Sequence, residues 1–323
     1  MALDPVPFVI GGDAEHGPDV FRQALYLATG GKQGVGAPGD LKVTPLDVPG
    51  PGVKIAAGGG TILNRTASQQ SYGVRNPTAD TESILVPASG SAGKRSHLVI
   101  CRVDNPYVDG NAQAPDDPVH GPYNRFDILP DVPAGTRLIR DLPQYKGLSA
   151  IELARIDMPA STGTATAATI TDLRQLTKPN ESNETLSDLG VNIGRLSATT
   201  GTVFPPFRPS IVVPDWATHV RVELSITGMS ALGNSTGKYN VQLQDSAGNN
   251  VVEGNSVAFN ADAVVSSTRI SQQAVAEGEI TGSRGKTLRP TTYMRKTDNN
   301  QADLKYDDAS QMLYRVAFYE RLA

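Results

Sequence analysis

The amino-acid sequence predicts a mainly β fold, with an N-terminal β-domain that carries one short helix, a linker or neck, and a C-terminal antiparallel β-sandwich. Short apolar segments recur between clusters of Gly, Pro, Asn and Asp, as expected for many short strands joined by turns. The 32 glycines and 23 prolines follow no collagen-like period. A chain of 323 residues is long for a single core, so we expect about two domains.

One segment near the amino terminus has helical periodicity. Within residues 18–31, apolar side chains recur three and four positions apart, and Gly30 and Gly31 supply a stop. Most of the following N-terminal sequence predicts short strands, which we place at residues 53–57, 84–86, 98–103, 136–140, 151–156 and 169–173. The Pro-rich stretch 104–125 is too long for a hairpin turn, so we expect it on the surface.

The C-terminal part alternates apolar and polar residues most clearly, which predicts strands with one buried face. Three segments show this pattern, and their predicted core residues are Val220, Val222, Leu224, Ile226, Tyr239, Val241, Leu243, Met312, Tyr314, Val316 and Phe318. In the second segment the polar partners are Asn240, Gln242 and Gln244, which we expect to face solvent. Trp216 precedes the first strand, and packing against the sandwich is favoured over a role as a sugar-binding platform.

A change of composition predicts domains at residues 1–176 and 202–323, joined by a polar linker or neck at 177–201. Apolar residues recur within this neck at spacings of three, four and three: Leu186, Leu189, Ile193 and Leu196. The spacing predicts a short helix or an irregular neck at which copies of the chain associate. Two glycines in the same stretch weaken the helical interpretation.

Charge and hydropathy exclude several classes of function. A net charge of −4 argues against a general nucleic-acid binder, which needs a basic face. No apolar run approaches the roughly 18 residues of a membrane-spanning helix. The amino terminus lacks the basic segment of a signal peptide, so we expect no secretion by the usual route. The single cysteine, Cys101, lies in an apolar segment and is predicted to be a buried structural thiol.

The sequence contains no recognisable catalytic or metal-binding pattern. The four histidines (His16, His97, His120 and His219) lack metal-ligand spacing, and we expect His97 and His219 to be solvated. Residues 282–287 resemble the end of a phosphate-binding loop, but Ile280 stands where that motif needs glycine.

The surface stretch contains four aspartates that could form a calcium site: Asp104, Asp109, Asp116 and Asp117. A solvated loop is favoured because no EF-hand spacing is present. We therefore predict no catalytic residue, no metal site and no cofactor, and expect that the chain is not an enzyme.

Three phrases in the N-terminal half carry a family resemblance. They are R-V-D-N-P at residues 102–106, L-A-R-I at 153–156 and I-T-D-L-R at 170–174. Together with the early helix and the β-domain, their order resembles the N-terminal module of minor tail or baseplate proteins of long-tailed (siphovirus-type) actinobacteriophages. The resemblance extends over about residues 1–176, and its phrases contain no catalytic residue.

This resemblance implies a virion structural protein of the tail tip, synthesised in the host cytoplasm and anchored through its N-terminal domain. It implies other tail or baseplate proteins as partners and favours a homo-oligomer, most simply a trimer. The C-terminal domain would then contact the host surface. One alternative is a module that binds host glycans. A glycan-degrading tail enzyme is less favoured, because such enzymes usually show a repetitive β-helix or two carboxylates at a cleft.

Overall fold

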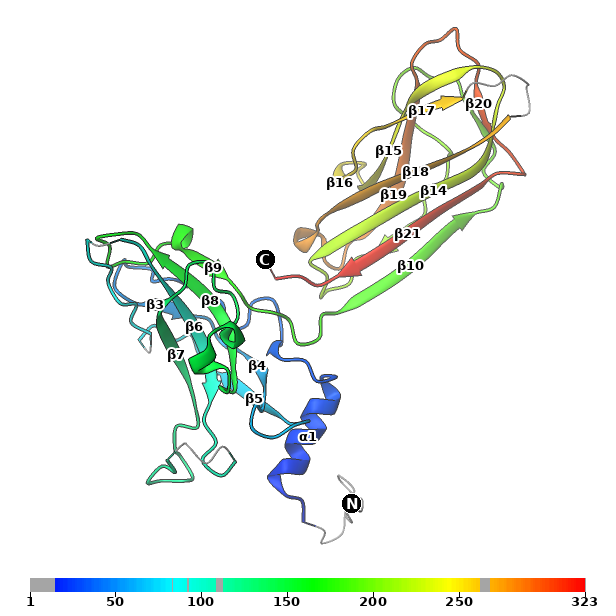
Figure 1. Cartoon of the computed structure of the whole chain (residues 1–323). Coiled ribbons are helices and arrows are strands. Elements are labelled where there is room, and N and C mark those ends of the chain that lie inside the picture. The colour runs from blue at the N-terminus through cyan, green and yellow to red at the C-terminus, as the bar shows by residue number, and fades with distance from the viewer. Residues whose placement is uncertain (1–14, 83, 92, 109–112, 262–267, 323) are drawn as a thin grey trace. The chain divides into compact units, whose positions relative to one another are not determined.

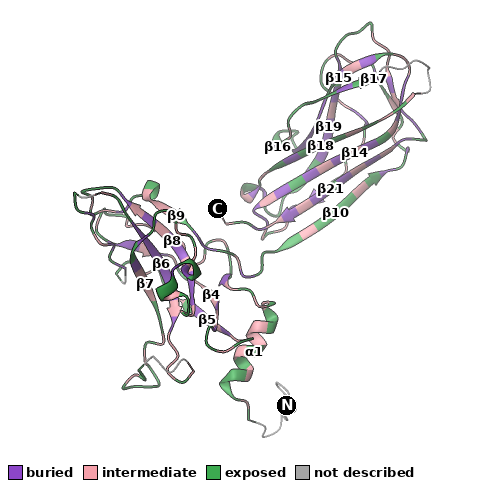
Figure 2. Ribbon diagram, in the orientation of Figure 1, coloured by how far each residue is buried: buried purple, intermediate pink, exposed green. Residues whose placement is uncertain are grey.

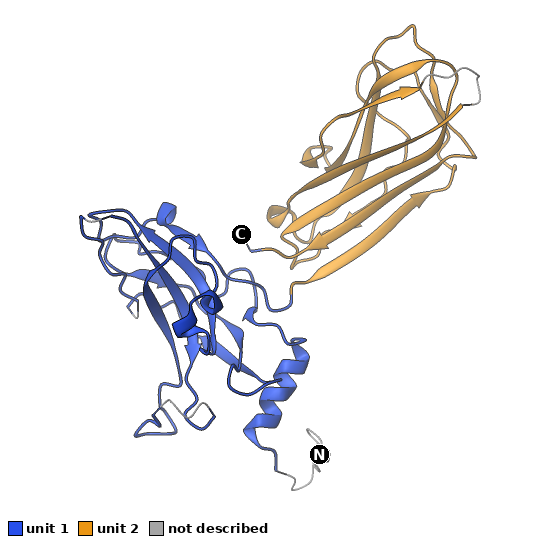
Figure 3. Cartoon of the chain, in the orientation of Figure 1, with its two compact units in different colours: residues 1–178, 322 blue, residues 179–321, 323 orange. Residues whose placement is uncertain are grey.

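The computed structural model describes residues 15–322 apart from 83, 92, 109–112 and 262–267. It contains two compact units, residues 1–178 and 179–321, which we call unit 1 and unit 2 (Figure 3). All pairs of named strands are antiparallel, and the mainly β prediction is confirmed. In the described part of the chain, no helix has the length and apolar character needed to span a membrane.

Unit 1 contains three sheets (Figure 1). The four-stranded sheet has the order β7-β6-β8-β9, formed by Asn124–Val132, Arg95–Val103, Ala150–Met158 and Ile170–Asp172. The three-stranded sheet has the order β1-β4-β5, formed by Gly34–Val35, Gly58–Leu63 and Ser71–Asn76. The remaining pair is β2 with β3, formed by Val43–Pro45 and Val53–Ile55. Three short 3-10 turns complete the unit: η1 (Ile139–Asp141), η2 (Pro143–Tyr145) and η3 (Ala167–Thr169).

The predicted helix is present as α1, Pro18–Ala28, and it contacts β5. Pro18 occupies the first turn, where its missing N–H costs nothing and its fixed φ suits a helix. Gly30 follows the helix with a φ of +60°, a conformation that favours glycine and ends the helix. The Arg22 guanidinium holds the helix to β5, because its carbon lies 5.8 Å from the ring centre of Tyr72.

Strand β6 forms the centre of unit 1 and is buried on both faces. Its residues Val99 and Cys101 pack into one apolar cluster, whereas Leu98 and Ile100 pack into another. Alternate side chains of a strand point to opposite faces, so β6 separates two layers of core. Burial raises the pKa of Cys101 to about 12, which confirms the predicted structural thiol.

Unit 2 is a sandwich of two six-stranded sheets. The first sheet has the order β10-β21-β14-β20-β11 with β18 also paired to β14, formed by Glu181–Asp188, Gln311–Tyr319, His219–Ala231, Leu304–Tyr306, Gly194–Leu196 and Thr268–Glu279. The second has the order β12-β19-β15-β16 with β13 on β19 and β17 on β15, formed by Thr202–Val203, Thr287–Lys296, Ser235–Gln244, Asn250–Glu253, Ile211–Val212 and Val257–Ala261. The 3-10 turn η4 (Thr281–Ser283) lies between β18 and β19.

One apolar core joins the two sheets, and Figure 2 shows its buried residues along β14, β15 and β21. All eleven apolar residues predicted from the alternating pattern are buried in it. Trp216 packs against this core, as predicted. The polar partners differ from expectation, because Asn240, Gln242 and Gln244 are only 8%, 8% and 2% exposed.

Two predicted strands of unit 1 are absent. Residues 84–86 form only an isolated bridge, in which Leu85 pairs with Gly52. The strand predicted at 136–140 is wrong, since the turn η1 begins at Ile139. The Ile139 N–H donates to the Glu152 carboxylate at 2.6 Å, so a side chain replaces the partner that a β-ladder would have supplied. Many other strands of both units were not predicted, among them the long strands β7, β18 and β19.

Residues 177–201, predicted as a linker or neck with a short helix or an irregular structure, contain no helix, and much of this stretch is part of unit 2. Residues 181–188 form β10, an edge strand that pairs with β21 along its whole length. The four apolar residues of the predicted neck do not act together: Leu196 is fully buried, Leu186 packs partly against the core, and Leu189 and Ile193 are 64% and 57% exposed.

The loop after β10 explains this difference. The buried Asp188 carboxylate accepts hydrogen bonds from the N–H groups of Val191 at 2.7 Å and Asn192 at 3.2 Å. Gly190 has a φ of +78°, and a Cβ atom there would lie 2.8 Å from the backbone oxygen of Asp307. Asp188 and Gly190 therefore define a tight loop. The apolar residues on either side of this loop have the spacing of a short helix, which explains the prediction.

Candidate functional site

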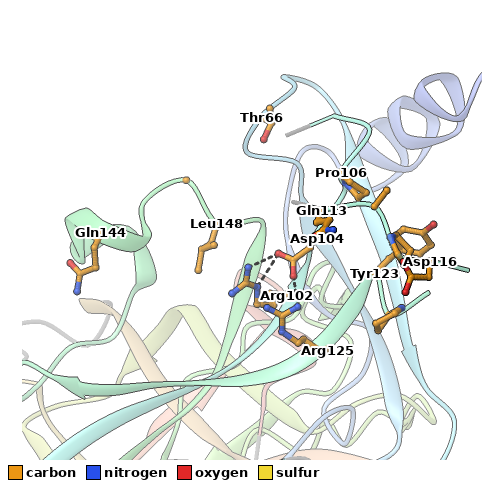
Figure 4. A pocket seen from close by; sticks show the side chains of 14 residues that line it. Thr66, Arg102, Asp104, Pro106, Gln113, Asp116, Tyr123, Arg125, Gln144 and Leu148 are labelled. Carbon is orange, nitrogen blue, oxygen red and sulfur yellow. Dashed lines mark hydrogen bonds and ion pairs between the residues drawn. The ribbon is translucent and has the colours of Figure 1, made fainter. Parts of the chain in front are cut away.

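A polar cavity of about 770 Å³ lies where β6 ends and β7 begins in unit 1 (Figure 4). The cavity includes much of the predicted surface stretch 104–125. The residues that line it are Thr66, Arg102, Asp104, Pro106, Gln113, Ala114, Pro115, Asp116, Pro122, Tyr123, Arg125, Gln144, Gly147 and Leu148. Its size and mixture of polar and aromatic side chains make it the candidate site of unit 1.

Two arginines and the aspartate between them organise its wall, as Figure 4 shows. Arg102 and Arg125 lie directly opposite each other on β6 and β7. Asp104 bridges them, with one oxygen 2.5 Å from Arg102 Nη2 and the other 2.5 Å from Arg125 Nη1. Asp127 lies 3.2 Å from Arg102 Nη1. Like charges that face each other across a ladder are destabilising, and these carboxylates neutralise them.

Each positive charge in this arrangement is matched by a carboxylate, so the charges of the four groups balance. Tyr123 donates a hydrogen bond to the Pro118 carbonyl at 2.8 Å, and its contact with Tyr107 raises the pKa of the Tyr123 hydroxyl. The wall therefore carries charged and hydrogen-bonding groups together with the ring of Tyr123.

The phrase R-V-D-N-P ends β6 and forms part of this wall. Its Arg102 and Asp104 make the ion pair described above. The Asn105 side chain donates to the Tyr72 hydroxyl at 3.1 Å, which links the phrase to β5. The first phrase of the family resemblance thus has a structural role at the edge of the cavity.

The other two phrases each contribute an arginine to a comparable ion pair away from the cavity. In β8, Arg155 pairs with Asp157 at 3.0 Å. At the end of β9, the fully buried Arg174 side chain pairs with Asp172 at 2.7 Å and donates to the carbonyl oxygen of Pro38 at 2.9 Å. Arg155 and Asp157 lie two residues apart on β8 and so share a face, whereas Arg174 lies just beyond the end of β9. Sequence analysis missed these pairs, although the R-x-D and D-x-R spacings could have revealed them.

His97 corrects another prediction, because it is fully buried instead of solvated. Its Nδ1 accepts a hydrogen bond from the Asp131 N–H at 3.2 Å. His219 is half-buried, and its ring stacks on Tyr319 with centroids 5.7 Å apart. His120 is exposed and bonds to the Asp117 carboxylate at 2.9 Å.

The buried His97 predicts a pH-dependent stability. Burial is the main reason that its pKa lies below 6.5, and nearby Arg95 lowers it further while Asp131 raises it. The unfolded chain regains the ordinary pKa and binds more protons, so the free energy of unfolding falls as the pH drops below about 6.5, by up to about 1.4 kcal/mol per pH unit.

Urea unfolding between pH 7.5 and 5 measures this dependence. The variant His97→Asn keeps an acceptor for the Asp131 N–H but cannot titrate, so its slope against pH should be smaller. The matched variant His120→Asn, at an exposed histidine, should keep the wild-type slope. Equal slopes in wild type and His97→Asn would contradict the prediction.

The carboxylates proposed as calcium ligands do not converge among the described residues, which contain no group of three or more potential metal ligands. Asp104 is held by two arginines, and Asp117 bonds to His120. Asp109 lies outside the described residues. The loop at residues 282–287 lies between β18 and β19, not between a strand and an α-helix, so it lacks the context of a phosphate-binding loop.

No protein-family model matches the sequence, and no curated protein matches it. Among solved structures, the chain is similar to the VP2 subviral particle of infectious bursal disease virus, with 10% identity, a TM-score of 0.26, and coverage of 90% of this chain and 75% of that one. The CBM22-1 xylan-binding domain of Paenibacillus barcinonensis Xyn10C has 15% identity, a TM-score of 0.21, and coverage of 45% and 88%. The enzymatically active domain of tailspike protein 4 from bacteriophage CBA120 has 11% identity, a TM-score of 0.20, and coverage of 44% and 19%. TM-scores this low do not indicate a shared fold.

Proposed function

We propose that this protein is a virion structural protein of the tail tip or baseplate of a long-tailed phage. The observation that carries the proposal is the match between two boundaries. The resemblance to minor tail proteins ends at about residue 176, and unit 1 ends at residue 178. All three phrases of the resemblance lie in unit 1, where each contributes an Arg–Asp pair.

In this proposal unit 1 attaches the protein to other tail or baseplate proteins, and unit 2 is the part that contacts the host surface. The polar cavity beside Arg102 and Tyr123 supplies hydrogen-bonding groups for a protein neighbour. The protein acts without catalysis and without a cofactor. It is made in the host cytoplasm and ends in the particle.

Electron microscopy of the phage that encodes this chain tests the proposal. Antibodies raised against the purified protein should label the distal end of the tail on intact particles. Labelling of the head, or the absence of the protein from purified particles, would contradict it. Release of oligosaccharides from host cell walls by the purified protein would instead support the tail-enzyme alternative.

We also propose that the protein assembles as a homo-oligomer, with a trimer favoured by the resemblance. The loop after β10 carries three exposed apolar side chains, Leu189, Val191 and Ile193. Its conformation is held by Asp188, so these side chains stay exposed unless another molecule covers them. Closed symmetry would cover the same loop in every copy.

Changing Leu189 and Ile193 together to aspartate should weaken this association and leave the fold intact, because both side chains are exposed. Light scattering at micromolar concentration measures the mass of wild type and variant. The variant Val212→Asp, at another exposed valine of unit 2, is the control and should keep the wild-type mass. A monomeric wild type, or an unchanged oligomer in the double variant, would contradict association through this loop.

A further inference from the structure

The outer face of the second sheet of unit 2 carries buried polar side chains. Along β15, Tyr239, Val241 and Leu243 point into the core, so Asn240 and Gln242 point to the opposite face. These two amides are nevertheless only 8% exposed. An outer sheet face that shields its amides in this way differs from the ordinary solvated face of a sandwich.

A hydrogen-bond network holds these amides in place. One oxygen of the Glu253 carboxylate accepts from Asn240 Nδ2 at 2.7 Å and from Gln242 Nε2 at 2.8 Å. Its other oxygen accepts from Asn250 Nδ2 at 2.9 Å. Within the described part of the chain, no donor bonds the side-chain oxygen of Asn240. The network therefore orients a polar surface and leaves an acceptor available to a ligand.

A hollow of about 230 Å³ lies beside this network. Its lining includes Asn240, Gln242 and Ser256, together with the ring of Tyr293, which lies opposite Asn240 on β19. Tyr293 is half-buried. Figure 1 shows the strands β15, β16, β17 and β19 that form this part of unit 2. An aromatic ring beside fixed amides suits a sugar, because a sugar ring has an apolar C–H face and hydroxyl groups around its rim.

Two positive charges mark the same hollow. Lys238 and Arg295 lie directly opposite each other on β15 and β19, and both are exposed. Among the residues that the structure describes, neither has an ion-pair partner. Arg102 and Arg125 face each other in the same way in unit 1, but there Asp104 neutralises them. The repulsion between Lys238 and Arg295 would be relieved by an anion from outside the chain.

We propose that this hollow is a binding site for an anionic saccharide, a sugar that carries a carboxylate or phosphate group. Lys238 and Arg295 bind the anionic group, Asn240 and Gln242 hydrogen-bond to ring hydroxyls, and Tyr293 packs against the sugar ring. The inference deepens the proposed function and rests on it, since it assigns the host-contacting role of unit 2 to one face of one sheet.

Affinity electrophoresis of the full-length protein tests the site. Native gels should contain polygalacturonate as a uronate polymer, yeast phosphomannan as a phosphate-bearing polymer, or neutral dextran. We expect one or both anionic polymers to retard the protein, and dextran to leave its mobility unchanged. Retardation by polygalacturonate alone assigns a carboxylate ligand, and retardation by phosphomannan alone assigns a phosphate ligand. Failure of both anionic polymers, or equal retardation by dextran, overturns the proposal.

Charge-reversal variants distinguish the site from general electrostatic attraction. Lys238→Glu and Arg295→Glu should each weaken the apparent affinity about tenfold, because each removes one cation from the site and adds a repulsive charge. Arg315→Glu makes the same change of charge at an exposed position of β21, on the other sheet, and should bind like wild type. Equal losses in all three variants, or no loss in any, would overturn the proposal.

A fourth variant tests the aromatic contact. Unfolding curves of all the variants show whether each of them is folded. Tyr293→Ala should also weaken retardation, and Tyr293→Phe should retain it, since the ring makes the proposed contact. The exposed charge variants are expected to fold, so the test stands even if Tyr293→Ala does not. Binding by a protein that is absent from the particle would overturn the proposed function and leave this site standing. A tail-tip protein that binds neither anionic polymer would overturn the site alone.

Discussion

Replacing Arg174 with methionine should lower the free energy of unfolding by about 3 kcal/mol, because it removes a buried guanidinium together with its ion pair and its hydrogen bonds to two backbone carbonyls. The Arg174 side chain is fully buried and pairs with Asp172 at 2.7 Å. It also donates to the backbone oxygens of Pro38 at 2.9 Å and Asp40 at 2.5 Å. The variant leaves a carboxylate without its partner and two carbonyl groups without these hydrogen bonds.

Urea unfolding with segment-resolved hydrogen exchange measures this effect. The loss of protection should appear in unit 1, first in the residues near Pro38 and in β9. Arg174→Lys keeps the charge but not the planar fork of donors, so it should recover only part of the loss. Arg137→Met, at an exposed arginine of unit 1, is the matched control and should change stability by less than about 0.5 kcal/mol. A variant Arg174→Met as stable as this control would refute the structural role of the pair.

Truncating Leu196 to alanine is the second large effect, and it should destabilise the protein by about 3 kcal/mol. Leu196 is fully buried in the core of unit 2, and its strand β11 pairs it with Leu304 of β20. The alanine leaves a cavity. The pairing of β11 with β20 keeps the backbone from moving in to close it. The loss combines the transfer energy of the missing methyl groups with the cost of that cavity.

Leu189→Ala provides the comparison, because Leu189 belongs to the same predicted neck but is 64% exposed. At a protein concentration where the chain is monomeric, it should leave the unfolding temperature unchanged. Thermal unfolding of both variants, with hydrogen exchange of β14 and β21, measures the difference. Equal effects of the two substitutions would show that these leucines share one environment, as the helical neck required, and would contradict the structure.

The amino-acid pattern predicts some elements of the fold well because their physics is local. Pro18 and Gly30 mark the ends of α1 through their own backbone preferences. The alternation from Val220 to Ile226 identifies a strand with one buried face, and the structure places that face in the core. The apolar surroundings of Cys101 in sequence likewise predict its burial.

Other elements depend on partners that are distant in sequence. β10 is a strand because β21, more than a hundred residues later, pairs with it. The spacing of apolar residues in the predicted neck does not reveal this partner. The spacing therefore places Leu186 and Leu196 in one group with Leu189 and Ile193, although their burial differs. The buried His97 is bonded by the N–H of Asp131, a residue 34 positions later that its local sequence does not reveal.

The sequence by itself therefore determined the mainly β class, the helix and the alternating strands of unit 2, since hydrophobic periodicity and backbone preferences act over a few residues. Only the tertiary structure decided which charges meet. Arg102 and Arg125 share Asp104, whereas Lys238 and Arg295 face each other without a carboxylate among the described residues. The reason is physical: strand register, set by packing across the whole sheet, determines which side chains become neighbours.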